Sequence, residues 1–100
     1  MTIKSYDDFL VNQLRDPELA AEYLTAAAED GSAELLLIAL RNVAEAHGGL
    51  GVLAGIANLN RQSMYKILSP DGNPTLTTLF TLLGPLGLQL AFTSREREVV

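Results

Sequence analysis

Apolar residues recur at helical spacing along almost the whole chain, and glycines or capping residues interrupt the pattern at intervals. Spacings of three and four residues place side chains on one face of an α-helix. The segment 35–44 shows the widest apolar face, and we expect it to form the central helix of the core. The pattern predicts an all-α protein, a small bundle of about five to six helices.

The predicted helix limits come from residues that begin or end a helix. Asp16 before Pro17 predicts a start, because the carboxylate accepts from free N–H groups and proline at the first position lacks no needed donor. Ser32 and Thr75 predict two further starts by the same capping chemistry. Gly31 predicts an end, since glycine adopts positive φ without steric strain.

The two ends of the chain carry shorter patterns. Tyr6, Phe9, Leu10 and Leu14 predict a short amphipathic helix that ends near Arg15. Residues 86–92 alternate apolar with small or polar side chains, which predicts a short C-terminal strand or an extended tail. A strand without a partner is unstable, so this segment would pair with a copy of itself or another chain, or pack down as coil.

Residues 50–68 predict a helix-turn-helix, in which two short helices cross at a steep angle. The crossing needs a small residue, which Ala54 supplies, and the turn needs a residue that tolerates left-handed backbone geometry, as Asn58 does. Asn60 stands where the second helix needs an N-cap. The residues predicted to pack this motif are Leu53, Ala54, Asn58, Leu59, Met64 and Ile67.

The second helix of this motif begins with polar side chains that we expect to point outward. Arginine can donate two hydrogen bonds to guanine and glutamine can pair with adenine, so such a helix start suits readout of the DNA major groove. The residues predicted to contact DNA are Asn60, Arg61, Gln62, Ser63, Tyr65 and Lys66. A generic helical hairpin with a solvated polar face is the alternative interpretation.

The net charge of −5 is unevenly distributed along the chain. Residues 1–49 hold nine acids and three bases, whereas residues 50–92 hold only Arg61, Lys66 and Asp71. DNA binders attract phosphate with lysine and arginine, so the acidity belongs to another surface than the predicted DNA contact. Such asymmetry suggests two surfaces with different partners, although a solvated acidic helix is its commoner meaning.

Residues that carry chemistry are scarce. The chain has no cysteine, which excludes disulfides and thiolate nucleophiles, and its one histidine, His47, stands near a helix end where histidine more often caps than catalyses. No acid pair, metal-ligand spacing or phosphate-binding loop accompanies it. We therefore expect neither an enzyme nor a bound cofactor or metal.

The sequence predicts a cytoplasmic protein without membrane contact. Residues 1–10 carry Asp7 and Asp8 and lack the apolar region of a secretory leader. The longest apolar stretch, residues 35–40, is too short to span a bilayer.

Several segments resemble addiction-module antidote proteins, which are lambda-repressor-like (XRE/Cro-type) helix-turn-helix antitoxins paired with small RelE-type toxins. The resemblance covers roughly residues 17–92, and its most specific part is Tyr65-Lys66-Ile67-Leu68 followed by Gly72-Asn73-Pro74-Thr75-Leu76. The family pattern usually carries a charged residue after Leu53-Ala54 and a glycine in the turn, where this chain has Gly55 and Asn58.

The resemblance implies an antitoxin of a type II toxin–antitoxin module. Such a protein neutralises its RelE-type toxin by direct contact and represses its own operon by binding operator DNA as a homodimer. Two half-sites are also expected on physical grounds, because one helix with few base contacts discriminates weakly. A stand-alone phage-like repressor and a protein-interaction module without DNA binding are the alternatives.

The resemblance leaves two interpretations of the acid-rich half. A toxin that cleaves messenger RNA presents a basic surface, which these acids would cover, with Phe9, Leu10, Tyr23 and Leu24 adding apolar contact. Alternatively these apolar residues are core and the acids are solvated. We expect one domain over residues 1–100, with N-terminal acidic helices (1–31), a helix-turn-helix core (32–92) and a C-terminal tail (93–100).

Overall fold

The computed structural model describes residues 9–95, and all regular secondary structure in that range is helical. Residues 9–13 form a short helical segment. The helices that follow are α2 (Pro17–Ala28), α3 (Ala33–Ala46), α4 (Leu50–Ile56), α5 (Arg61–Ile67) and α6 (Leu76–Leu83). The predicted all-α class is confirmed for the described residues, whereas Tyr6 of the expected first helix lies outside them.

Side-chain caps begin four of these helices, as the sequence predicts. Asp16, Ser32, Asn60 and Thr75 each accept a hydrogen bond from a backbone N–H two or three residues later, at 2.9 to 3.2 Å. Pro17 occupies the first turn of α2. Each such cap contributes on the order of 1 kcal/mol to stability, so the local sequence fixes where these helices start.

Left-handed residues end the first two long helices. Gly31 after α2 has a φ of 74°, and Gly48 after α3 has a φ of 102°. Beyond α3 the N–H of Gly49 donates to the carbonyl of Ala44 at 2.9 Å, which satisfies a carbonyl of the last turn. The chain therefore turns directly from α3 into α4.

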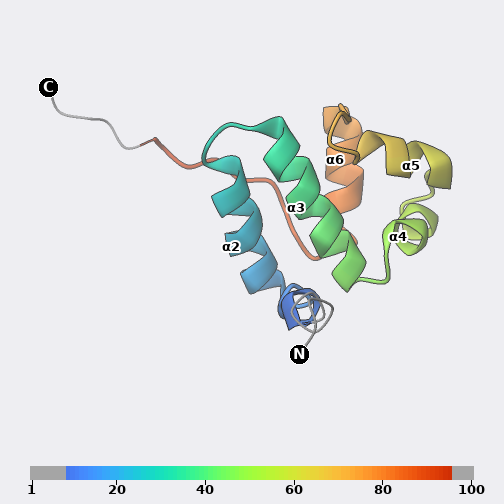
Figure 1. The fold of residues 1–100 in the computed structure, drawn as a ribbon, viewed down its shortest axis with the longest axis horizontal. Coiled ribbons are helices and arrows are strands. Elements are labelled where there is room, and N and C mark those ends of the chain that lie inside the picture. The colour runs from blue at the N-terminus through green and yellow to red at the C-terminus, as the bar shows by residue number, and fades with distance from the viewer. Residues whose placement is uncertain (1–8, 96–100) are drawn as a thin grey trace, which may run out of the picture.

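Helix α3 stands at the centre of the arrangement (Figure 1). It packs against α2 on one side and α4 on the other, and α4 packs against α5. Six of its residues are buried: Leu37, Ala39, Leu40, Val43, Ala44 and Ala46. The prediction that this segment forms the central core helix is confirmed.

The core also draws on residues from the other elements. Among the most deeply buried side chains are Leu14, Leu53, Met64, Leu68, Leu82 and Leu86. Burying one such side chain stabilises the fold by roughly 1.5–3 kcal/mol, so residues that are distant in sequence hold the helices together.

The predicted C-terminal strand is wrong for the residues that the structure describes. The N–H of Leu88 donates to the carbonyl of Leu83 at 3.0 Å, and residues 88–95 then continue without regular structure. Leu88 packs against the core, while Phe92 is 90% exposed. Residues 88–95 are coil in this single chain, and no other described segment forms a strand, so an extended tail is what the structure shows.

Candidate nucleic-acid interface

The turn between α4 and α5 is built around Asn58. Its φ of 58° is the one positive value at a non-glycine residue in the described chain. The N–H of Asn58 donates to Gly55 at 3.2 Å and the N–H of Leu59 donates to Ala54 at 2.8 Å, the bond pair of a Schellman turn. The predicted left-handed geometry at Asn58 is confirmed.

The side chains predicted to pack α4 against α5 differ in burial. Leu53, Ala54 and Met64 are buried, at 2%, 1% and 0% exposure, whereas Leu59 and Ile67 are partly buried against the same core. Asn58 itself is exposed and serves the turn through its backbone. The buried residues hold α5 against α4 and so set the position of the start of α5.

The side chains predicted to contact DNA are all exposed: Asn60, Arg61, Gln62, Ser63, Tyr65 and Lys66. One of them has a structural task, because Asn60 Oδ1 accepts the backbone N–H of Ser63 at 3.0 Å and caps α5. Within residues 9–95, the side chains of Gln62 and Lys66 make no hydrogen bond or ion pair. They are therefore available to an external partner.

Arg61 has two neighbours that direct its guanidinium group. Its Cζ atom lies 5.9 Å from the centre of the Tyr65 ring, one turn later on α5. On the other side is Gly51 of α4, where an added Cβ atom would lie 3.1 Å from Arg61 Nε. The guanidinium thus occupies the space between the first turn of α4 and an aromatic ring of α5.

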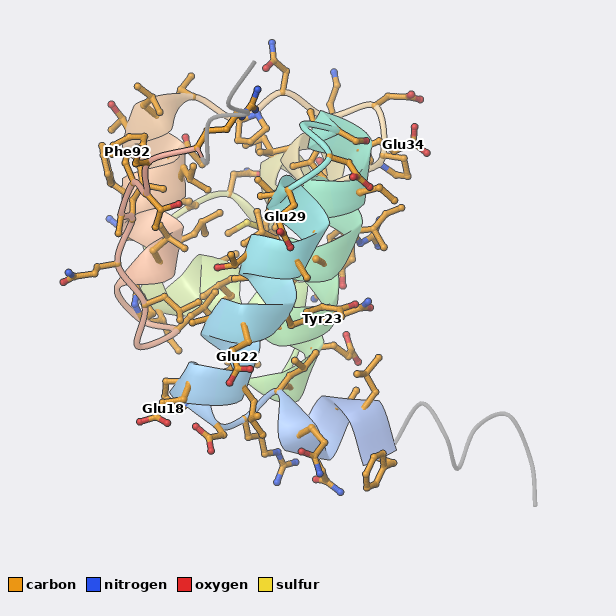
Figure 2. All side chains as sticks on the ribbon, turned by 90° about the vertical axis from the view of Figure 1, so that its left-hand side faces the viewer. Glu18, Glu22, Tyr23, Glu29, Glu34 and Phe92 are labelled. Atoms are coloured by element: carbon orange, nitrogen blue, oxygen red, sulfur yellow. The ribbon has the colours of Figure 1, made fainter. Side chains whose placement is uncertain are left out.

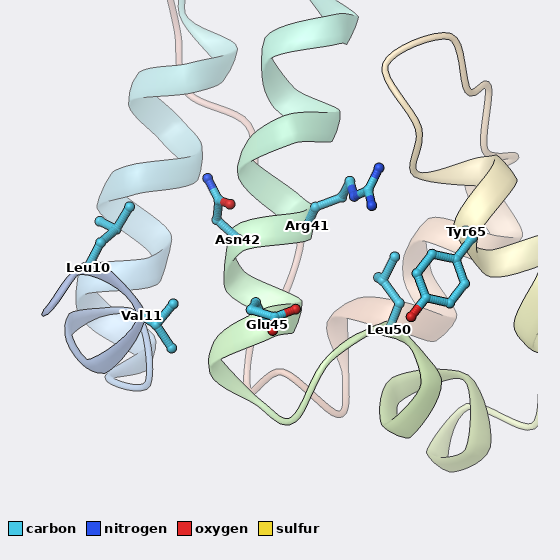
Figure 3. A pocket seen from close by; sticks show the side chains of 7 residues that line it. All are labelled: Leu10, Val11, Arg41, Asn42, Glu45, Leu50 and Tyr65. Carbon is cyan, nitrogen blue, oxygen red and sulfur yellow. The ribbon is translucent and has the colours of Figure 1, made fainter. Parts of the chain in front are cut away.

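A cavity of about 400 Å³ adjoins this surface (Figure 3). Its lining combines both charges with apolar groups from four elements: Leu10, Val11, Arg41, Asn42, Glu45, Leu50 and Tyr65. Arg41 extends from α3 toward the side on which Tyr65 lies (Figure 3). The sequence alone did not mark Arg41 as a candidate. The direction of its side chain depends on where α5 lies relative to α3, and no nearby residue in the sequence indicates that.

A second surface carries much of the acidity of the chain. Glu18 and Glu22 are exposed on α2, Glu29 is exposed at its C-cap, and Glu34 is exposed at the start of α3 (Figure 2). We call Glu18, Glu22, Glu29 and Glu34 the acidic surface. Figure 1 shows α2 and α5 on opposite sides of α3, so this surface is separate from the start of α5.

The four apolar residues considered in the N-terminal half differ in whether they belong to the core or are exposed to a partner. Leu10, Tyr23 and Leu24 are partly buried and pack against the core. Phe9 differs, because 60% of its surface is exposed. Three of the four residues therefore pack against the core, and Phe9 is the one whose side chain is mostly exposed.

The predictions about metal ions and about His47 can be compared with the described residues. No three His, Asp or Glu side chains within residues 9–95 gather closely enough to hold a metal ion. His47 is the C-cap of α3, where its backbone N–H donates to the carbonyl of Ala44 at 3.0 Å. None of the helices described is long and apolar enough to cross a membrane.

The fold and this surface together define a small helical protein in which two short helices, α4 and α5, pack together across a tight turn and leave a polar helix start exposed. The model of a family described as probable addiction module antidote proteins matches residues 2–94, so the chain belongs to that family of antitoxins. The chain is 33% identical over 89 residues to an uncharacterized protein of Haemophilus influenzae (strain KW20 / Rd), covering 89% of this chain and 91% of the relative. No solved structure matches the chain.

Proposed function

We propose that this antidote protein belongs to a type II toxin–antitoxin module, in which it binds a RelE-type toxin directly and represses its own operon. In this proposal the pair α4–α5 is a lambda-repressor-like (XRE/Cro-type) helix-turn-helix that binds operator DNA as a homodimer. The protein acts by binding and not as an enzyme. Family membership supports the antitoxin role. The start of α5, the apolar face of α6 and the acidic surface support DNA binding, dimerisation and toxin binding respectively.

The observation that carries the DNA-binding proposal is the exposed start of α5. Arg61, Gln62 and Ser63 are consecutive exposed residues at the N-terminal end of α5, which packs against α4 through buried side chains such as Met64. In the proposed complex this end enters the major groove, where Arg61 and Gln62 contact base edges. Lys66 then contacts phosphate and contributes to affinity for any sequence.

An uncharged face of α6 supports the homodimer. Leu76 and Phe80 are four residues apart on this helix, so they share a face, and they are 66% and 56% exposed. Helix α6 contains no charged residue. Two copies of a chain with net charge −5 repel each other. The repulsion is weakest when they associate through an uncharged apolar face, so this face is the proposed dimer interface.

The acidic surface supports direct contact with the toxin. A protein that acts on RNA needs a basic surface to hold the phosphate backbone, and carboxylates complement such a surface. Phe9 also lies in the acid-rich N-terminal half of the chain, and its exposed ring adds an apolar contact. Because the acidic surface and α5 are separate, one molecule has room for toxin and DNA together.

The alternative is a protein-interaction module that binds the toxin without binding DNA. The small number of basic residues favours it, since residues 50–92 hold only Arg61 and Lys66 besides Asp71. Arg41 of α3 adds one more positive charge beside this region (Figure 3). Binding to operator DNA distinguishes the two functions.

The proposed pairing is tested by co-expression with the protein encoded next to this chain. We expect the two proteins to co-purify as a stable complex, and expression of this chain to relieve the growth arrest caused by its neighbour. Addition of duplex DNA from the operon's own promoter is expected to yield a larger complex. A neighbour that neither binds this chain nor arrests growth would contradict the antitoxin proposal.

A further inference from the structure

The contacts of Arg61 reach beyond its own helix. A Cβ atom built on Gly51 would lie 3.1 Å from Nε, 3.2 Å from Cζ and 3.5 Å from Nη2 of Arg61. Cβ contacts this short are rare in proteins, so the guanidinium fills the space that a side chain at position 51 would need. On its other side Cζ is 5.9 Å from the Tyr65 ring centre, within the range of a cation–π contact.

The backbone of α4 does not itself require glycine at position 51. Neither Gly51 nor Gly55 has a positive φ, and both lie inside the helix. Glycine is less favourable than alanine within a helix, so the backbone of α4 gives no reason for glycine at position 51. The two positions differ in their surroundings, because a Cβ atom at Gly55 would meet nothing within 4 Å.

We propose that Gly51 and Tyr65 are positioning residues that hold the Arg61 guanidinium in the direction in which it contacts operator DNA. The proposal rests on the proposed DNA-binding function and deepens it. A free arginine side chain loses rotamer freedom when it binds, and one that is already held loses less. Gly51 supplies the space and Tyr65 supplies the surface against which the guanidinium rests.

The first test compares Gly51→Ala with Gly55→Ala, a matched change in the same helix. Both variants replace a helical glycine, so both are expected to melt no lower than the wild type. Fluorescence anisotropy with operator duplex then measures affinity. Gly51→Ala is expected to weaken binding roughly threefold to tenfold, because Arg61 has to move aside, while Gly55→Ala leaves it unchanged.

A double-mutant cycle shows whether the effect passes through Arg61. In an Arg61→Ala background, Gly51→Ala is expected to change the affinity no further. Tyr65→Leu removes the ring and is expected to weaken operator binding, whereas Tyr65→Phe keeps the ring and weakens it less. A loss caused by Gly51→Ala that persists without Arg61 would overturn the positioning role.

Failure of this inference is distinguishable from failure of the proposed function. Wild-type binding with equal affinity for the Gly51→Ala and Gly55→Ala variants would overturn the positioning role and leave DNA binding intact. Wild-type protein that shows no preference for operator over scrambled duplex would overturn both. The wild-type titration therefore comes first.

Discussion

Asn42 of α3 donates a hydrogen bond from Nδ2 to the hydroxyl oxygen of Tyr23 of α2 at 2.7 Å. The bond joins the helix that carries most of the acidic surface to the central helix of the core. Both residues are partly buried, so water competes only in part for the groups that form this hydrogen bond. Asn42 also lines the cavity that Tyr65 borders from α5 (Figure 3).

Removing the Tyr23 hydroxyl is expected to loosen the contact between α2 and α3. We expect Tyr23→Phe to lower the free energy of unfolding by about 0.5–1.5 kcal/mol, the usual net contribution of one hydrogen bond. Urea denaturation measures the change. In an Asn42→Ala background the same substitution is expected to have almost no effect, and an equal loss there would assign the effect to packing.

The backbone at Asn58 gives a prediction about the turn between α4 and α5. Asn58→Ala is expected to destabilise the protein by roughly 1–2 kcal/mol, because alanine tolerates a positive φ poorly. Asn58→Gly keeps or slightly raises stability, because glycine adopts this geometry freely. Thermal melts of both variants check the order, and an alanine variant as stable as the glycine variant would contradict it.

The crossing of α4 and α5 has no room for a larger side chain at Ala54, which is 1% exposed. Ala54→Leu is expected to overpack this site at a cost of about 1–3 kcal/mol of stability. Chemical denaturation gives the size of the effect. A variant with wild-type stability would mean that the two helices have space to separate without loss.

How far the sequence predicts this fold depends on the range of each signal. The caps at Asp16, Ser32 and Asn60 were predictable, because capping chemistry acts over two or three residues. The bend at Asn58 was predictable for the same reason. All four are properties of short segments.

Features that depend on distant parts of the chain were not predictable. Alternation in residues 86–92 suits a strand, but it contains no information about a strand to pair with. Helical spacing at Tyr23 and Leu24 marks an apolar face without saying whether that face meets the core or a partner. The proximity of Gly51 to Arg61 depends on how α4 crosses α5, and neither residue signals it alone.

The acidic surface is tested best by charge reversal. Truncation is unsuitable, because Leu14 and Ala20 of the N-terminal half are buried in the core. Glu18→Lys with Glu22→Lys is expected to weaken toxin binding at least tenfold at low salt, through lost attraction and new repulsion. Operator binding is not expected to weaken.

Asp71→Lys is the matched control for either single substitution, Glu18→Lys or Glu22→Lys, since it reverses one exposed charge in the loop after α5. Isothermal titration with the co-encoded toxin measures the affinities. If the Asp71 variant loses as much toxin affinity as either single α2 variant, the contact depends on overall charge and the acidic surface is not the binding site.

The central claim is that the start of α5 reads operator DNA, and a salt titration of operator binding tests it most directly. We predict preference for promoter duplex over scrambled duplex, an affinity that falls as salt rises, and a loss of about 1–3 kcal/mol for Arg61→Ala or Gln62→Ala with unchanged folding. Equal binding to both duplexes, or none at low salt, would contradict the account.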